Sequence, residues 1–65
     1  MNSAYEWIPV GAALPGDNVD VLIHIKGRPV WIGYLENGVW HFPDGDTVIG
    51  HVTHWTIIPP PPKVA

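Results

Sequence analysis

The 65-residue sequence contains no cysteine, so neither a disulfide framework nor a cysteine-based zinc site can hold the fold. It is also poor in basic residues: Lys26, Arg28 and Lys63 stand against six acidic residues, and the formal net charge is −3. Proteins that bind long nucleic acid or an anionic membrane present several Lys and Arg side chains to phosphates. We therefore expect neither a long nucleic acid nor a membrane among the partners.

Long apolar stretches are missing as well. No run approaches the ~18 apolar residues that a membrane-spanning helix requires. The first residues lack the basic segment and apolar core of a secretory signal. These two absences predict a cytoplasmic protein.

Residue patterns that support catalysis are also absent. The chain has no cysteine nucleophile, no G-x-S-x-G elbow, no phosphate-binding P-loop and no dinucleotide-binding glycine pattern. The four histidines are His24, His41, His51 and His54. His51 and His54 would face opposite sides of a regular strand, although a bulge at Gly50 would change that. We predict no metal, no cofactor and no enzymatic activity; a histidine-based metalloenzyme is the weakest alternative.

Tryptophan, by contrast, is abundant: there are 4 in 65 residues, with 46% apolar residues, 7 Gly and 8 Pro. This length allows one domain, and the glycines and prolines are too many for a helical bundle. Ordering such a chain costs on the order of 100 kcal/mol, which a small core must offset without disulfides. Large aromatic side chains or self-association would supply the stabilisation, and we expect a homo-oligomer.

Alternating apolar residues indicate short β-strands separated by turns. The predicted strands are residues 19–26, 30–35, 39–42, 47–49 and 52–58, after an extended piece at 7–10. In the first strand, Val19, Val21, Ile23 and Ile25 form one apolar face. Both faces of the second strand are apolar, so we expect it to lie inside the sheet.

The strongest local signal is Asn37-Gly38, because both residues tolerate the positive φ of a two-residue type I′ hairpin. This turn predicts the register of the two strands that it joins. The predicted pairs are Glu36 with Val39, Leu35 with Trp40, Tyr34 with His41, and Gly33 with Phe42. A glycine opposite a phenylalanine leaves room for the ring.

These elements predict an all-β fold, a small antiparallel SH3-like barrel of four to five short strands. We expect a flexible N-terminus at residues 1–6, a single small β domain at 7–58 and a proline-rich tail at 59–65.

Motifs between residues 7 and 62 resemble those of one family. They are Trp7-Ile8-Pro9-Val10, Leu14-Pro15, Val21-Leu22-Ile23, Ile32-Gly33-Tyr34, Gly38-Val39-Trp40 and Val52-Thr53-His54-Trp55, followed by Pro59-Pro60. The pattern is similar to that of the short bacterial and phage proteins grouped as domain of unknown function 551, and the V-T-H-W block is its most specific part. The sequence departs at residues 56–58, where the family often has Met-Pro-Leu. The resemblance implies a bacterial or bacteriophage origin and supplies no function.

Two groups of aromatic residues are candidates for structural and binding roles. Trp7 and Trp55, at the two ends of the expected barrel, are predicted to be buried and to clasp the termini, with His54 a buried imidazole that orders a loop. Trp31 and Trp40 share a face with Leu35 and Phe42. If that face is outward, it is an interface; if inward, it is core.

Two functions of different kind fit these features. The first is a non-catalytic accessory interaction protein of a phage or prophage, acting in the host cytoplasm and countering a host defence system by binding a host protein. The alternative is a sponge for a small molecule or nucleotide, with a pocket formed between subunits. In it, aromatic rings would stack on a base and a basic turn would hold a phosphate. The candidate binding residues are Trp31, Trp40, Tyr34, Lys26 and Arg28.

Overall fold

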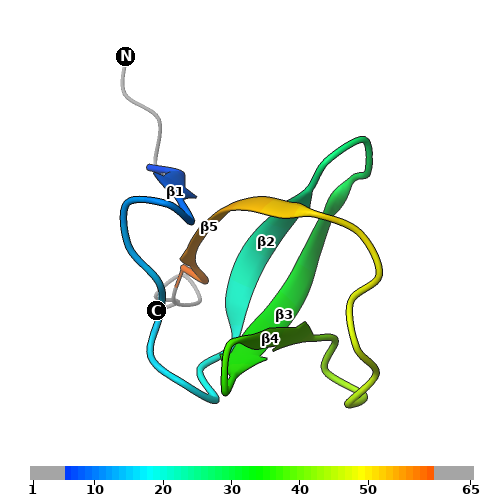
Figure 1. Cartoon of the computed structure of the whole chain (residues 1–65). Coiled ribbons are helices and arrows are strands. Elements are labelled where there is room, and N and C mark those ends of the chain that lie inside the picture. Colours follow the sequence, from blue (N-terminus) through cyan, green and yellow to red (C-terminus); the bar gives the residue numbers. More distant parts are fainter. Residues whose placement is uncertain (1–5, 60–65) are drawn as a thin grey trace, which may run out of the picture.

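The computed structural model describes residues 6–59. Most of the expected flexible N-terminus and proline-rich tail lies outside the described residues. Five strands are present: β1 (Ile8–Pro9), β2 (Val21–Ile25), β3 (Val30–Glu36), β4 (Val39–His41) and β5 (Val52–Ile57). They form one curled antiparallel sheet in the order β1-β5-β2-β3-β4, and residues 6–59 contain no helix (Figure 1). The predicted all-β fold of short antiparallel strands is confirmed.

The sheet is not closed, so the word barrel describes it only loosely. β1 and β4 lie at the two ends of the strand order and do not pair with each other. β1 has two residues, one of them Pro9, which has no amide hydrogen to continue a ladder. β4 has three residues. On the side of β4 away from β3, the described residues form only one isolated bridge, between His41 and Thr47. The expected strand at 47–49 is thus reduced to this bridge.

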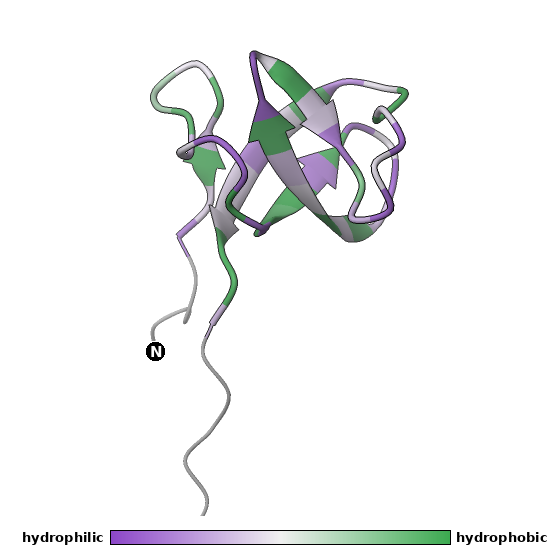
Figure 2. Cartoon of the chain, turned by 90° about the horizontal axis from the view of Figure 1, so that it is seen from below, coloured by the Kyte–Doolittle hydropathy of each residue, from purple (hydrophilic) through white to green (hydrophobic). Residues whose placement is uncertain are grey.

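β2 lies at the centre of the strand order, between β5 and β3. Its apolar face is buried as the alternation predicted: Val21, Ile23 and Ile25 are 0–1% exposed. The strand is shorter than predicted, because Val19 lies outside it and is exposed. Figure 2 shows hydrophobic and hydrophilic residues mixed along the strands, and β2 itself has one polar residue, His24.

The hairpin between β3 and β4 has the predicted turn and register. Asn37 and Gly38 both have positive φ, 52° and 80°. The pairs Glu36 with Val39, Leu35 with Trp40 and Tyr34 with His41 are all present. The fourth predicted pair, Gly33 with Phe42, lies beyond the end of β4 at His41. The Asn37-Gly38 turn therefore accounts for the register of β4 against β3.

A bulge in β5 sets which of its residues face the core. His24 pairs with His54, but the next residue of β2, Ile25, pairs with Val52, so Thr53 is the extra residue. Regular alternation predicted Val52 and His54 on one face. The bulge instead places Val52 and Trp55, three residues apart, in the same core.

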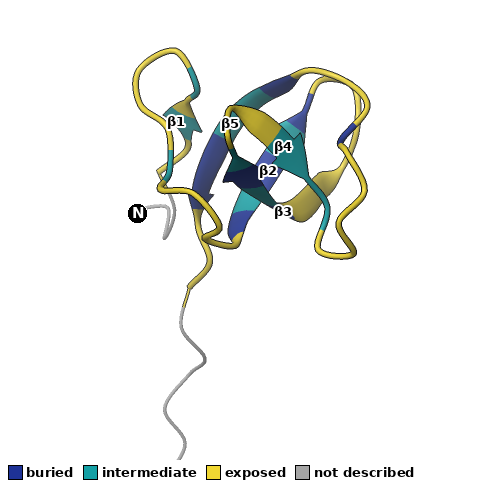
Figure 3. Ribbon diagram, turned by 60° about the horizontal axis from the view of Figure 1, so that its bottom comes forward, coloured by how far each residue is buried: buried dark blue, intermediate teal, exposed yellow. Residues whose placement is uncertain are grey.

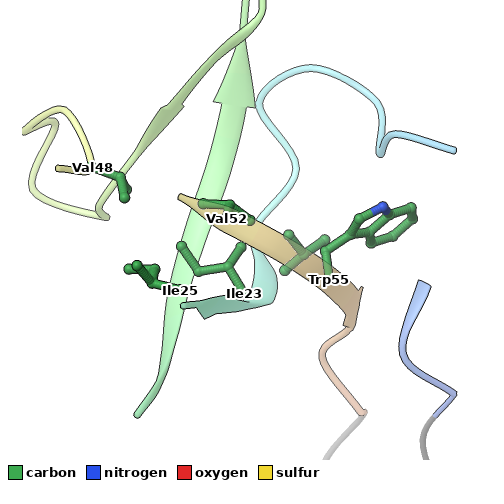
Figure 4. Close-up of a cluster of buried hydrophobic side chains, with 6 residues drawn as sticks. Ile23, Ile25, Val48, Val52 and Trp55 are labelled. Atoms are coloured by element: carbon green, nitrogen blue, oxygen red, sulfur yellow. The ribbon is translucent and has the colours of Figure 1, made fainter. Parts of the chain in front are cut away.

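The core lies inside the curl of the sheet. Its buried members are Val21, Ile23, Ile25, Val48, Val52 and Trp55 (Figure 4). Trp55 is 8% exposed, and its indole Nε1 donates a hydrogen bond to the carbonyl of Ala13 at 2.9 Å. The predicted burial of Trp55 is confirmed, and its hydrogen bond to Ala13 ties the N-terminal segment to the last strand.

The prediction that Trp7 is buried is wrong: its side chain is 38% exposed. Ile8 is the residue opposite Trp55, so Ile8 shares the core face and packs against the core. Because side chains alternate along a strand, Trp7 is displaced to the other face. There its ring meets the edge of His24, with centroids 6.4 Å apart.

Candidate interaction surface on strand β3

Strand β3 is covered along only half its length. Val30, Trp31 and Ile32 are 48%, 47% and 42% exposed, whereas Gly33 and Leu35 further along the same strand are buried (Figure 3). Residues 30–32 carry no charge and expose apolar side chains on both faces of the sheet. We call them the exposed β3 segment.

The exposed β3 segment results from the early end of β4. β4 pairs with β3 only at Tyr34–Glu36. Continued in the same register, β4 would place residue 43 opposite Ile32, and residue 43 is a proline, which has no amide hydrogen to donate. The chain turns away there, and the amide of Gly45 donates to the carbonyl of Phe42 at 2.8 Å. Residues 30–32 therefore have a neighbouring strand only on the β2 side among the described residues.

Two residues of this segment direct their backbone hydrogen-bonding groups toward the edge of β3 that β4 leaves unpaired. In a two-residue hairpin the closing pair, here Glu36 and Val39, exchanges both hydrogen bonds, and the direction then alternates along the strand. The carbonyl of Leu35 follows this rule, because it accepts the amide of Asn18 at 2.8 Å on the side away from β4. By the same alternation Val30 and Ile32 direct their N–H and C=O groups to the open edge.

Trp31 is the largest side chain of the segment. Its cross-strand partner is Ile23, so its ring lies on the core face of the sheet, at the rim. It meets Phe42 edge to face, with ring centroids 5.9 Å apart. Arg28 and Asp44 line a shallow hollow of about 520 Å³ beside it. A second hollow of about 420 Å³, lined in part by Leu22 and Ile32, adjoins it.

The five candidate binding residues are only partly brought together. Trp31 and Arg28 line the same hollow. Trp40 shares the face of Trp31 as predicted, but that face is the inner one, and Trp40 is half-buried against the core. Tyr34 lies on the opposite face, stacked on His41 with centroids 5.2 Å apart. Lys26 is exposed in the turn after β2, and its amide donates to the carbonyl of His51.

The sequence reasoning missed Val30, Ile32 and Pro43 as parts of this surface. The sequence contains a signal for them, because one further pair in the Asn37-Gly38 register sets Pro43 opposite Ile32. Extending the register by one pair would have predicted that β4 must stop there.

A second feature, a polar one, lies on the outer face of the sheet. The prediction that His54 is buried is wrong: it is half-buried, because it pairs with His24 on the face away from the core. The Nδ1 atoms of His24 and His54 lie 3.0 and 2.9 Å from the hydroxyl oxygen of Thr53, the bulged residue. That hydroxyl also donates to the carbonyl of His24 at 3.3 Å.

The two imidazoles border a shallow groove of about 340 Å³ together with Trp7 and Val30. Since both Nδ1 atoms meet at one hydroxyl, their Nε2 atoms lie on the sides of the rings away from this common point. No group of three or more His, Asp or Glu residues within residues 6–59 could hold a metal ion.

The described residues define a small all-β protein with an open five-stranded sheet and an apolar strand edge. A family model described as protein of unknown function (DUF551) matches residues 6–63, and the chain belongs to this family, as its motifs indicated. No curated protein and no solved structure matches the chain. Within residues 6–59 no helix has the length and hydropathy needed to cross a membrane.

Proposed function

We propose that the protein is a non-catalytic interaction module that binds an extended protein segment along the exposed β3 segment. The observation that supports it is the run Val30–Ile32, where three neighbouring apolar side chains are 42–48% exposed beside outward-facing backbone groups. Sheet edges of this kind are normally protected by charge, proline or a covering loop. An added strand would satisfy the backbone groups and cover the side chains at once.

Backbone contacts and side-chain contacts would contribute differently to recognition. Backbone hydrogen bonds at Val30 and Ile32 would supply affinity for any extended chain. The hollows on either side of Trp31 would supply specificity, because alternate side chains of the added strand would enter them. Trp31 lies at the centre of this segment, and tryptophan is one of the residue types enriched among those that dominate binding energy.

The source of the protein and the compartment in which it acts are a separate prediction. The family resemblance favours a phage or prophage protein that acts in the host cytoplasm, and binding a host protein to counter a defence system is the form of the function that this setting suggests. The absence of nucleophile and cofactor motifs in the sequence supports a role without catalysis.

The test compares two matched variants, Ile32→Lys on the exposed β3 segment and Ile49→Lys, which changes an isoleucine that is 78% exposed in the loop before β5. The wild type and the two variants are each tagged and co-expressed in a bacterial host with an untagged copy of the same chain. The proteins that are retained with each tagged chain are quantified by mass spectrometry. We expect at least one protein to be lost about tenfold or more with Ile32→Lys and kept with Ile49→Lys. If no retained protein depends on Ile32, the proposal fails.

A small-molecule ligand is the second candidate, supported by the shared hollow of Arg28 and Trp31. A ligand with an aromatic ring and an anionic group would stack on the indole and pair with the guanidinium. Titration of the protein with a mononucleotide, followed by calorimetry, tests it. Binding that is lost in Arg28→Ala would support this candidate, and an absence of heat in the wild type would remove it.

A further inference from the structure

We infer that the strand added at the exposed β3 segment is the same segment of a second copy, in antiparallel register, with Trp31 facing Trp31 across a twofold axis. This inference rests on the proposed function and names its partner. The pairing uses the β3 edge, and of the residues that border the histidine groove only Val30 takes part in it.

The backbone pattern of the segment is complementary to itself. An antiparallel pair centred on Trp31 places Val30 of one copy opposite Ile32 of the other, and the reverse. Both of these residues direct their N–H and C=O groups outward, so each pair can exchange two hydrogen bonds. Trp31 directs its backbone groups to β2 and needs none from the second copy. A pairing centred on Val30 would set Ile32 opposite residue 28, whose amide already donates to the carbonyl of Ile25. One centred on Ile32 would set Val30 opposite Tyr34, which is already paired with His41.

The side chains agree with this register. A pair that exchanges no hydrogen bonds brings its Cα atoms to about 4.5 Å, so the two indoles would lie in contact on one face. Aromatic cross-strand pairs at such positions are among the stabilising ones in antiparallel sheets. On the other face Val30 would lie beside Ile32 of the second copy.

The charged side chains beside Trp31 also favour a second copy of the chain as the partner, against the effect of the net charge. The whole chain has a net charge of −3, which opposes self-association. At this edge, however, the cation Arg28 and the anion Asp44 line the hollow beside Trp31. In the twofold register the added strand ends at Val30, because Tyr34 is already paired with His41 of β4 and leaves no place for residue 28. The chain before Val30 therefore passes the end of β4, and Arg28 is brought toward the segment that carries Asp44 of the other copy.

The size of the surface sets the strength of the dimer. Three side chains that are less than half exposed, with the hollows beside them, offer less than the ~800 Å² per partner of a stable interface. We therefore expect a weak dimer that forms and dissociates with concentration, rather than a permanent one.

Sedimentation equilibrium of the full chain from about 10 μM to about 1 mM tests the inference directly over the range of a weak interface. We expect the apparent mass to rise from one chain toward two in the wild type and in Ile49→Lys, and to stay at one chain in Ile32→Lys. A wild type that stays monomeric over this range, or an Ile32→Lys variant that still dimerises, overturns it.

The register has its own test, because the chain contains no cysteine. In the proposed dimer Trp31→Cys meets itself at a distance that a disulfide can span, whereas a cysteine at residue 30 meets residue 32 instead. Mild oxidation should therefore cross-link Trp31→Cys several-fold faster than Val30→Cys and Ile49→Cys. Equal rates for the three variants contradict the register, and a fast Ile49→Cys shows a different dimer.

The outcomes separate this inference from the proposed function. If Ile32→Lys abolishes capture of another protein while the wild type is monomeric, the surface binds a different partner and only the inference fails. If neither capture nor self-association depends on Ile32, both fail.

Discussion

The two halves of β3 differ in burial in the opposite sense to their hydrophobicity. The first half, Val-Trp-Ile, is the more hydrophobic, yet its three residues are exposed. The second half contains Gly33 and Leu35, both buried, and Tyr34 and Glu36, both half-buried. The difference comes from the neighbouring strand, since β4 covers only the second half.

This contrast shows that hydrophobicity alone does not decide burial in so small a sheet. A side chain becomes buried when another strand or loop crosses it, and the length of β4 is limited by Pro43. Natural sheets usually protect an uncovered edge with charge or proline. Here the edge is short, uncharged and apolar, and our proposal that it binds a partner rests on this difference.

The largest difference should appear between Ile32 of the exposed half and Ile23 of the neighbouring strand β2 when each is truncated to alanine. Ile23, opposite Trp31 and fully buried, should lose about 2–5 kcal/mol of unfolding free energy in Ile23→Ala, because a cavity forms in the core. Ile32→Ala in the exposed β3 segment should cost no more than about 1 kcal/mol. Urea denaturation followed by tryptophan fluorescence measures both, and equal losses would show that the exposed half is core after all.

Gly33 marks the boundary between the halves and should be the next most sensitive position. An added Cβ would lie 2.8 Å from Ile23 Cδ1 and 2.9 Å from the carbonyl oxygen of His41. Because the second contact is backbone, Gly33→Ala should destabilise by about 1–3 kcal/mol.

Gly11→Ala is the matched control for this position. An added Cβ at Gly11 meets nothing within 4 Å, so the substitution should be neutral or slightly stabilising. Thermal unfolding of the two variants by circular dichroism gives the comparison. A Gly33→Ala variant as stable as Gly11→Ala would mean that β3 and β4 do not approach as closely as described.

Much of the fold was predictable because it follows from local rules. The apolar alternation of β2 and the Asn37-Gly38 turn with its register came from the sequence and are confirmed. The bulge at Thr53 was not predictable, because it depends on how β5 fits against β2 and no local residue pattern requires it. The exposure of Trp7 has a similar cause, since a short edge strand can place either of two neighbouring residues toward the core.

The candidate surface was predicted less completely than the fold. Trp31 and Trp40 were identified as the pair whose exposure would decide between core and surface; Trp31 is 47% exposed and Trp40 is half-buried. Of the two alternatives left open, the outward face does not hold, because the curl of the sheet turns their common face inward. Which face of a two-sided apolar strand is covered depends on contacts between distant segments, and a single sequence does not contain that information.

The tryptophans give a smaller and more specific comparison. Trp55→Phe keeps most of the ring but removes the hydrogen bond from Nε1 to the carbonyl of Ala13, and should cost about 0.5–1.5 kcal/mol. Trp31→Phe loses no hydrogen bond within the described residues and should cost less. Hydrogen exchange should also show faster opening near residue 13 only in Trp55→Phe. Equal behaviour of the two variants would mean that the bond to Ala13 does not hold the N-terminal segment.

The smallest expected effect is the most specific to the exposed half of β3. If the segment pairs with a second copy, native dimer formation stabilises the fold by about RT ln 2, roughly 0.4 kcal/mol, when the chain concentration equals the dissociation constant. For a domain of this size that corresponds to a rise in Tm of about 2–3 °C. The rise should grow with concentration in the wild type and in Ile49→Lys. In Ile32→Lys the Tm should not change with concentration, because a charge now occupies the edge. A Tm that depends equally on concentration in all three chains would assign the association to another surface, and the exposed β3 segment would then be an uncovered edge and nothing more.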